Sequence, residues 1–493
     1  MRRLLVAVCG AGATLAALAA SPAAATEEGP LRVALVIGNN QAPTADVEAL
    51  RYADDDALAT AELLIEAGVH TVVLTRMDDE TWRLHQQAAP FDAPTPAALT
   101  RAVLELGRAV APATAAGRGV ELLFFYSGHG DVERGEGRLA LEGGRLTRRA
   151  LHEQVIAPLA PTASHVIIDA CRSSFMAYAR GPGGRRAAAP AGFSRPEVAT
   201  RVGYVLSTSS ERDSHEWQGF QAGVFSHEVR SALRGAADAD LDAHISYAEL
   251  GAFLATANAG IANERFRPDV LLLPPAKGPE VGALDEVVLA WPPGSSLLVD
   301  EGRSHVEDEQ GRRLLDVPPA ATPLLVRLPL AQRLFVSSGG HERVLEAGAS
   351  TLRASELPEA PRTVAARGAA HDAAFRVLFS APFGAEEVAR YRARPAPALP
   401  EASMPPLAVA AWSALGVASA CALGAAVAEG VGWGVYASAA DAPQIERAEA
   451  NETIGGLNLA AAIGAGVAVV GGASAVALFV VDGVAAGAAE EAP

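Results

Sequence analysis

Two short motifs carry residues that can do nucleophilic chemistry. His129 lies between two glycines in Ser-Gly-His-Gly (127–130), and Cys171 follows Asp-Ala (169–170), 42 positions further on. A thiolate can attack a carbonyl carbon, an imidazole can protonate the leaving amine, and backbone N–H groups can stabilise the oxyanion. The glycines let the backbone approach a substrate, so the amides of Gly130 and Cys171 are candidate oxyanion donors. We predict that His129 and Cys171 form a catalytic dyad.

An alternation of strands and helices positions these motifs. Strands are predicted over 31–37, 71–75, 120–126, 165–169 and 203–207, and helices over 56–67, 95–110 and 149–159. The strands are continuous apolar runs, which is typical of parallel strands buried on both faces. In such sheets the reacting groups lie at the carboxyl ends of strands, where both motifs fall. We therefore expect an α/β domain over 31–273 with a mostly parallel sheet flanked by helices.

The two motifs, in this order and at strand ends, resemble the caspase and metacaspase superfamily of cysteine peptidases. Its signature places the histidine about 50 residues before the cysteine. Further matching blocks are 36–40, 50–57, 214–217 and 223–227, so the resemblance covers about 31–257. It implies a caspase-like fold and endopeptidase activity. The block at 50–57 argues against the other Cys-His families that resemble gingipains or legumains. A catalytically silent caspase-like scaffold that binds partners is the alternative from another class.

The resemblance also implies a specificity pocket. The positions that match the metacaspase pocket are Asp56 and Asp169, with Ser127 beside them, whereas a caspase has Gln at the position of Asp169. Two carboxylates favour a basic P1 side chain, and the planar guanidinium of Arg pairs with a carboxylate through two hydrogen bonds. We expect protein or peptide substrates cleaved after Arg, with Lys also accepted. The competing role for Asp56 is to cap the helix that it begins.

An acidic loop near the end of this domain has the oxygen spacing of a calcium site. The candidate ligands are Asp238, Asp240, Asp242 and Glu249. Ala243 stands at the position where such loops carry Gly, and a left-handed conformation there costs on the order of 1 kcal/mol. Calcium is therefore a candidate cofactor, although the dyad chemistry requires none. Helix capping by solvated acids is the alternative.

Both ends of the chain have membrane-related patterns. Residues 1–25 show the basic start, apolar run and A-x-A pattern of a cleaved signal peptide, with an uncleaved signal anchor as the alternative. Residues 406–428 and 457–481 are each long enough to cross a bilayer, with a buried soluble hairpin as the alternative. We expect a multi-pass cell-membrane protein with the peptidase domain on the periplasmic or extracytoplasmic side. The expected loop, 433–456, contains one basic residue, which runs against the positive-inside tendency.

Between these parts, short β-like runs at 286–291, 296–299, 323–328, 333–337 and 375–379 predict a small β-rich domain over 280–394. Linkers are predicted at 272–279 and 395–405, where Pro, Gly and Ala gather. The Arg-rich loop 179–196 is a candidate self-cleavage site or a plain linker.

The amino-acid composition narrows the possible classes of protein and of binding partner. The 493 residues include 40 Lys and Arg against 57 Asp and Glu, a net charge of −17, which argues against nucleic acid as a partner. Only three cysteines occur, which excludes a disulfide scaffold. Cys9 lies in the signal and Cys421 in a predicted membrane segment, so Cys171 is the one thiol expected in the mature soluble body.

Overall fold

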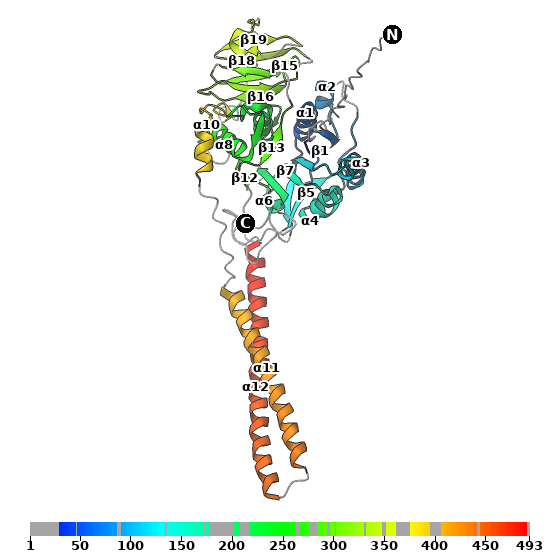
Figure 1. Cartoon of the computed structure of the whole chain (residues 1–493), viewed down its shortest axis with the longest axis vertical. Helices are drawn as coiled ribbons and strands as arrows, with labels where there is room; N and C mark the ends of the chain where they lie inside the picture. Colours follow the sequence, from blue (N-terminus) through cyan, green and yellow to red (C-terminus); the bar gives the residue numbers. More distant parts are fainter. Residues whose placement is uncertain are drawn as a thin grey trace, which may run out of the picture.

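The computed structural model comprises a layered α/β body, a β-rich region and a long helical hairpin (Figure 1). The described ranges are 29–45, 47–85, 90–133, 136–171, 173–177, 201–207, 216–262, 267–276, 283–292, 296–300, 302–329, 332–347, 352–360, 375–394, 406–440 and 444–490. The expected signal peptide (1–25), the linker 395–405 and the Arg-rich loop 179–196 lie outside them.

A six-stranded sheet forms the centre of the body in the order β12-β8-β7-β3-β1-β2. Its strands are β1 (Leu31–Asn39), β2 (His70–Thr75), β3 (Val120–Gly128), β7 (Ala163–Asp169), β8 (Val202–Ser207) and β12 (Val270–Leu273). All neighbours pair in parallel except β12, which runs antiparallel to β8. The predicted α/β class with a mostly parallel sheet is confirmed. One boundary differs, because residues 272 and 273 belong to β12 and not to a linker.

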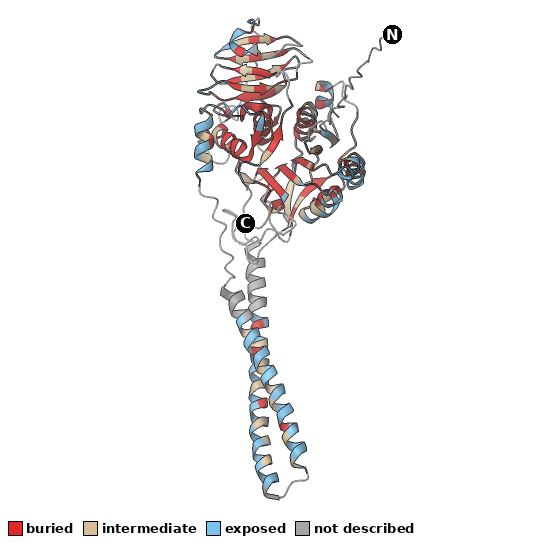
Figure 2. Ribbon diagram, in the orientation of Figure 1, coloured by how far each residue is buried: buried red, intermediate tan, exposed pale blue. Residues whose placement is uncertain are grey.

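Helices cover both faces of this sheet, which explains the unbroken apolar runs (Figure 2). In β1, Ala34 and Val36 join one buried cluster, and Leu35 and Ile37 join the other. The first face holds α1 (Ala53–Glu66), α7 (Val224–Ser231) and α8 (Tyr247–Ala257). The second face holds α3 (Pro96–Ala115) and the helical segment α4-η1-α5 (148–159). The short helices α2 (Asp79–Leu84) and α6 (Ser174–Ala177) flank these layers.

Small antiparallel sheets extend the body beside the strand ends. One sheet, β4 (Gly130–Glu133), β5 (Glu136–Leu141) and β6 (Gly144–Thr147), begins directly after His129. A two-stranded ribbon, β9 (Glu216–Trp217) and β10 (Ala222–Gly223), leads into α7. The π-helical segment η3 (Ala232–Ala236) follows α7, and β11 (His244–Ser246) then pairs with β13 (Val287–Ala290).

The β-rich region adds two further sheets, β17-β14-β20 and β16-β15-β18-β19. Their strands are β14 (Ser296–Val299), β15 (Ser304–Asp308), β16 (Arg313–Val317), β17 (Leu324–Arg327), β18 (Leu334–Ser338), β19 (His341–Leu345) and β20 (Leu352–Arg353). The expected strand at 375–379 is wrong, since these residues form helical turns. The reason is their spacing: Phe375, Leu378 and Phe379 are buried at i, i+3 and i+4, which places them on one side of a turn. Helix α10 (Ala385–Arg392) follows.

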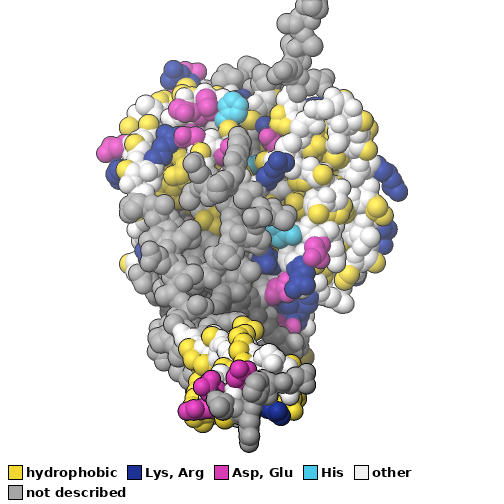
Figure 3. Space-filling view, turned by 60° about the horizontal axis from the view of Figure 1, so that its bottom comes forward, with side chains coloured by type: hydrophobic (Ala, Val, Ile, Leu, Met, Phe, Trp, Pro, Cys, Tyr) yellow, Lys and Arg dark blue, Asp and Glu magenta, His cyan; other side chains and the backbone are white. Residues whose placement is uncertain are grey.

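The C-terminal hairpin consists of α11 (Pro406–Ala439) and α12 (Gln444–Glu490), two helices long and apolar enough to cross a membrane. The candidate spans are Ser413–Ala439 and Glu446–Ala477. The expected loop at 433–456 is therefore mostly helical, because its Ala-rich sequence continues the helix beyond the apolar run. Charged side chains gather at the tip of the hairpin (Figure 3).

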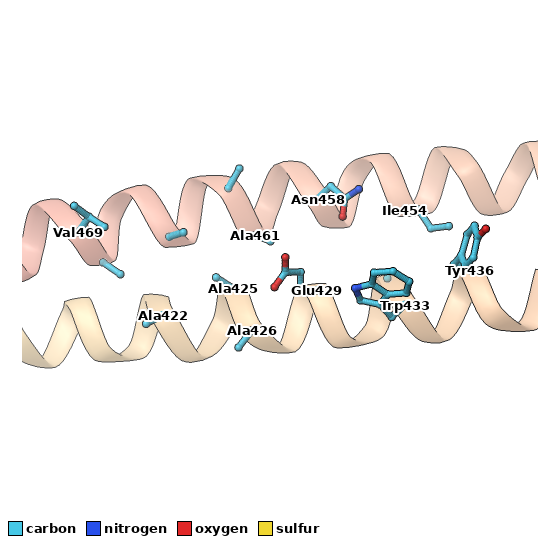
Figure 4. Close-up of a pocket in the computed structure, with 14 residues that line it drawn as sticks. Ala422, Ala425, Ala426, Glu429, Trp433, Tyr436, Ile454, Asn458, Ala461 and Val469 are labelled. Atoms are coloured by element: carbon cyan, nitrogen blue, oxygen red, sulfur yellow. The ribbon is translucent and has the colours of Figure 1, made fainter.

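A groove of about 920 Å³ lies between α11 and α12. Alanines make up half of the 14 residues that line it, and Trp433 is also among them. Glu429 of α11 faces α12, which contributes Asn458 (Figure 4). The first candidate span thus contains one carboxyl, whereas the apolar segment expected from the sequence ended one residue before it.

Candidate active site

The candidate dyad stands at the carboxyl ends of two paired strands. Strands β3 and β7 are parallel neighbours, and their last paired residues are Ser127 and Asp169. His129 and Cys171 each follow that pair by two positions, so both strands deliver their residue at the same level. Cys171 is partly exposed and forms no disulfide within the described part of the chain.

Buried donors fix the loop that carries His129. The Tyr126 hydroxyl donates to the His129 carbonyl at 2.8 Å, and the Ala140 N–H donates to the same carbonyl at 2.9 Å. The His129 ring holds a hydrogen bond to the backbone of Glu48, while its Nε2 is buried with no partner among the described residues. Burial lowers the pKa of His129, which favours the neutral imidazole. A neutral imidazole whose Nε2 has no hydrogen-bond partner among the described residues can accept a proton and later donate it.

Gly130 permits the close approach of the two strand ends. A Cβ atom at this position would lie 2.5 Å from the Cys171 carbonyl oxygen and 3.0 Å from the Ala170 Cβ. Neither neighbour is a flexible side chain, so any larger residue must separate the two motifs.

We expect Gly130→Ala to destabilise the fold by about 1–3 kcal/mol through overpacking and to lower activity by about 100-fold through misplacement of the dyad. The matched control is Gly107→Ala in α3, where a Cβ meets nothing within 4 Å. That change is expected to raise helix stability by about 0.5–1 kcal/mol. Thermal melts and peptidase assays on both variants check this prediction. Equal changes in stability and activity in Gly130→Ala and Gly107→Ala would contradict it.

The three predicted pocket residues come together around Gly223. Asp56 accepts hydrogen bonds from the Ser127 hydroxyl (2.9 Å) and the Gly223 N–H (3.1 Å), both at Oδ2. A Cβ on Gly223 would lie 2.9 Å from Asp56 Oδ2 and 2.6 Å from Asp169 Oδ2, so the two carboxylates flank this glycine.

The two carboxylates differ in their availability to a ligand. Asp56 is 1 % exposed, and its Oδ1 forms an ion pair with Arg230 Nη1 at 2.8 Å. Asp169 is partly exposed, and its Oδ2 accepts from the Ser226 N–H and hydroxyl. Its Oδ1 accepts no hydrogen bond from the residues that the structure describes. Among the described residues, Asp169 is therefore the open carboxylate of the two, whereas both oxygens of Asp56 are paired.

Burial and the neighbouring charge set the protonation of this pair. Burial raises the pKa of Asp169, and the Asp56 carboxylate raises it further, to about 7. Burial also raises the pKa of Asp56, but Arg230 opposes that shift by stabilising the ionised form. Asp56 does not cap α1, since that helix begins at Ala53 and Glu216 accepts the N–H groups of the two preceding residues.

Sequence reasoning did not assign roles to Arg230, Ser226 or Gly223. The block 223–227 was recognised only as a point of resemblance. A usable signal was present, because Ser226 and Arg230 are four residues apart and share one face of a helix.

The acidic loop is only partly assembled as expected. Carboxylate oxygens of Asp238, Asp240 and Asp242 all lie within 4.8 Å of one another. Glu249 is not in this group, because its carboxylate accepts from the Ser246 N–H and hydroxyl in the capping box of α8. Ala243 has φ 66°, the left-handed conformation foreseen for this position.

The comparison with protein-family models matches the part of the chain that carries this site. Residues 31–264 match the model of the caspase domain of peptidase family C14. This part of the chain belongs to the caspase-like peptidase superfamily. Thirty-two chains of solved structures also match.

One of those chains is the crystal structure of the Drosophila initiator caspase Dronc, with 8 % identity over 39 % of this chain and a TM-score of 0.23. The match spans 60 % of the Dronc chain. No curated protein matched the sequence.

Proposed function

We propose that this protein is a cysteine endopeptidase that cleaves proteins after Arg, and more slowly after Lys. Cys171 attacks the scissile carbonyl carbon, and His129 takes the thiol proton and gives it to the leaving amine. The Gly130 and Cys171 amides stabilise the oxyanion. The observation that carries the proposal is the shared level of His129 and Cys171 beyond β3 and β7, with the open carboxylate of Asp169 beside them.

Peptide-aminomethylcoumarin substrates that differ only at P1 test this function. Arg is expected to give the highest kcat/KM, Lys a lower value and Asp none, and alkylation by iodoacetamide is expected to abolish cleavage. Absence of cleavage of every peptide would favour the catalytically silent scaffold instead. A preference for Asp would refute the basic pocket.

We propose that cleavage needs no cofactor and that calcium binds the three clustered aspartates with low affinity. None of the three contacts the dyad or the pocket carboxylates through a hydrogen bond between described residues. A chelator is therefore expected to leave kcat/KM unchanged within about twofold, while millimolar calcium raises the melting temperature through mass action. Asp240→Asn is expected to remove that rise. Calorimetry without heat and an unchanged melting temperature would rule out the ion.

We propose that α11 and α12 cross the cell membrane and that the peptidase domain lies on its extracytoplasmic side. The length and apolar surface of both helices support the crossing. The signal-like pattern of residues 1–25 supports the orientation. Substrates are then exported or membrane proteins with an exposed Arg.

A further inference from the structure

Helix α7 is buried along its whole length, although five of its eight residues are polar or charged. They are Ser226, His227, Glu228, Arg230 and Ser231. Burying such groups is costly unless each finds a partner. The partners of α7 therefore show what this helix connects.

One set of partners belongs to the pocket. Ser226 binds Asp169 through its N–H and its hydroxyl, and Arg230 binds Asp56. The N-cap residue, Gly223, donates its N–H to Asp56. Both pocket carboxylates thus depend on the position of α7.

The other set belongs to the β-rich region. His227 Nε2 lies 2.8 Å from Oδ2 of Asp316 in β16, and the Asp316 N–H donates to the Ser231 hydroxyl at 3.0 Å. Arg313 binds both oxygens of Asp316, at 2.7 and 2.5 Å. Phe220 stacks on the His227 ring with centroids 3.9 Å apart.

Asp316, His227 and Ser231 are fully buried, so the contacts between them are shielded from water. Burial alone would raise the pKa of Asp316, but Arg313 and His227 hold it well below its usual range. The carboxylate is therefore ionised and paired.

We propose that Asp316 is a positioning residue for the basic-P1 pocket, acting through His227 and Ser231 to set α7 against Asp56 and Asp169. This inference rests on the proposed function. The β-rich region is then a structural part of the specificity site and not a detachable module. Loss of one partner from a buried charged cluster leaves the others uncompensated, so α7 must shift. A shift of about 1 Å in a positioning element can cost 100-fold in rate.

The test compares Asp316→Asn with Asp308→Asn in the full-length protein. Asp308 is the matched control for Asp316. It is 2 % exposed, lies in the same β15-β16 hairpin and pairs with Arg312, but it makes no hydrogen bond to α7. Asp316→Asn is expected to raise KM for a P1-Arg peptide about tenfold, with kcat changed by less than about threefold. Hydrogen exchange of the peptide 223–231 is expected to accelerate in this variant alone.

Unchanged KM and exchange in Asp316→Asn, or equal changes in Asp308→Asn, would overturn the inference. If the unmodified protein cleaves no P1-Arg peptide, the proposed function fails, and the exchange of 223–231 alone decides the role of Asp316. If Asp316→Asn does not fold, Ser231→Ala decides, because it removes the hydrogen bond from the Asp316 N–H and, besides that, only the bond that the Ser231 hydroxyl donates to the His227 carbonyl within the helix. Ser231→Ala is expected to accelerate the exchange of 223–231 in the same way, with a smaller increase in KM. Unchanged exchange in Ser231→Ala would contradict the proposal.

Discussion

Replacing Cys171 with alanine is expected to lower kcat/KM for a P1-Arg peptide by about 10⁴-fold or more, about 5.5 kcal/mol of transition-state stabilisation. In the proposed mechanism the thiolate forms the covalent intermediate. The other two cysteines of the sequence, Cys9 and Cys421, are expected in the signal peptide and in a membrane span, so neither is expected to replace it. The melting temperature should change little, because Cys171 is partly exposed at a strand end.

A double-variant cycle separates a dyad from two independent contributions. His129→Ala alone should cost nearly as much as Cys171→Ala, and the double variant should be no worse than either, because groups that act as one unit are not additive. Additive losses would show that the two residues do not work together.

The Cys171→Ala variant also tests self-processing. We propose that the enzyme cuts itself in the loop 179–196, because its sequence contains four arginines and the proposed function is cleavage after Arg. Fragments that appear on a gel with the active protein should be absent with Cys171→Ala. The same fragments from the inactive variant would mean that another protease produces them.

Replacing Asp169 with asparagine is expected to lower kcat/KM for P1-Arg by about 100-fold, or about 2.7 kcal/mol, within the range for loss of one partner of a buried charge pair. A peptide with citrulline at P1 is the neutral control, because citrulline has nearly the shape of Arg without its charge. Its cleavage should change little, so the ratio of Arg to citrulline cleavage should fall. An unchanged ratio of Arg to citrulline cleavage would show that Asp169 does not bind the P1 side chain.

The pH dependence gives this prediction a second measurement. Because the pKa of Asp169 is raised to about 7, this carboxyl is mostly neutral at pH 6 and mostly ionised at pH 8. Only the ionised form pairs with a P1 guanidinium, so kcat/KM for Arg should rise as the pH increases through 7. In Asp169→Asn that rise should disappear. His129 does not produce it, because burial moves its pKa below the ordinary value.

The sequence was sufficient for five of the six strands of the central sheet, but not for β12, part of which had been expected to be a linker. Apolar runs that stop at a glycine-containing motif, such as 120–126, predict buried parallel strands and the region where they end. The pairing of β3 with β7 then follows only from the family resemblance, because register depends on tertiary packing.

The ion pair between Arg230 and Asp56 was not predictable in the same way. The two residues are 174 positions apart, and the spacing of Ser226 and Arg230 on one helix face does not show which carboxylate that face contacts. The sequence therefore indicated two equivalent pocket acids, whereas the structure has one neutralised acid and one open acid. His227 and Asp316 were missed for the same reason, since their contact joins regions that were treated as separate domains.

Helices α11 and α12 run antiparallel, so the end of α12 returns toward the body that precedes α11 (Figure 1). If both helices cross the bilayer, the C-terminus and Cys171 occupy the same compartment. A C-terminal alkaline phosphatase fusion then reports the compartment of the active site without interrupting the peptidase domain. Phosphatase activity is expected if the active site is extracytoplasmic. Fluorescence from a reporter that is fluorescent only in the cytoplasm, fused at the same position, would place the active site in the cytoplasm instead and change the set of accessible substrates.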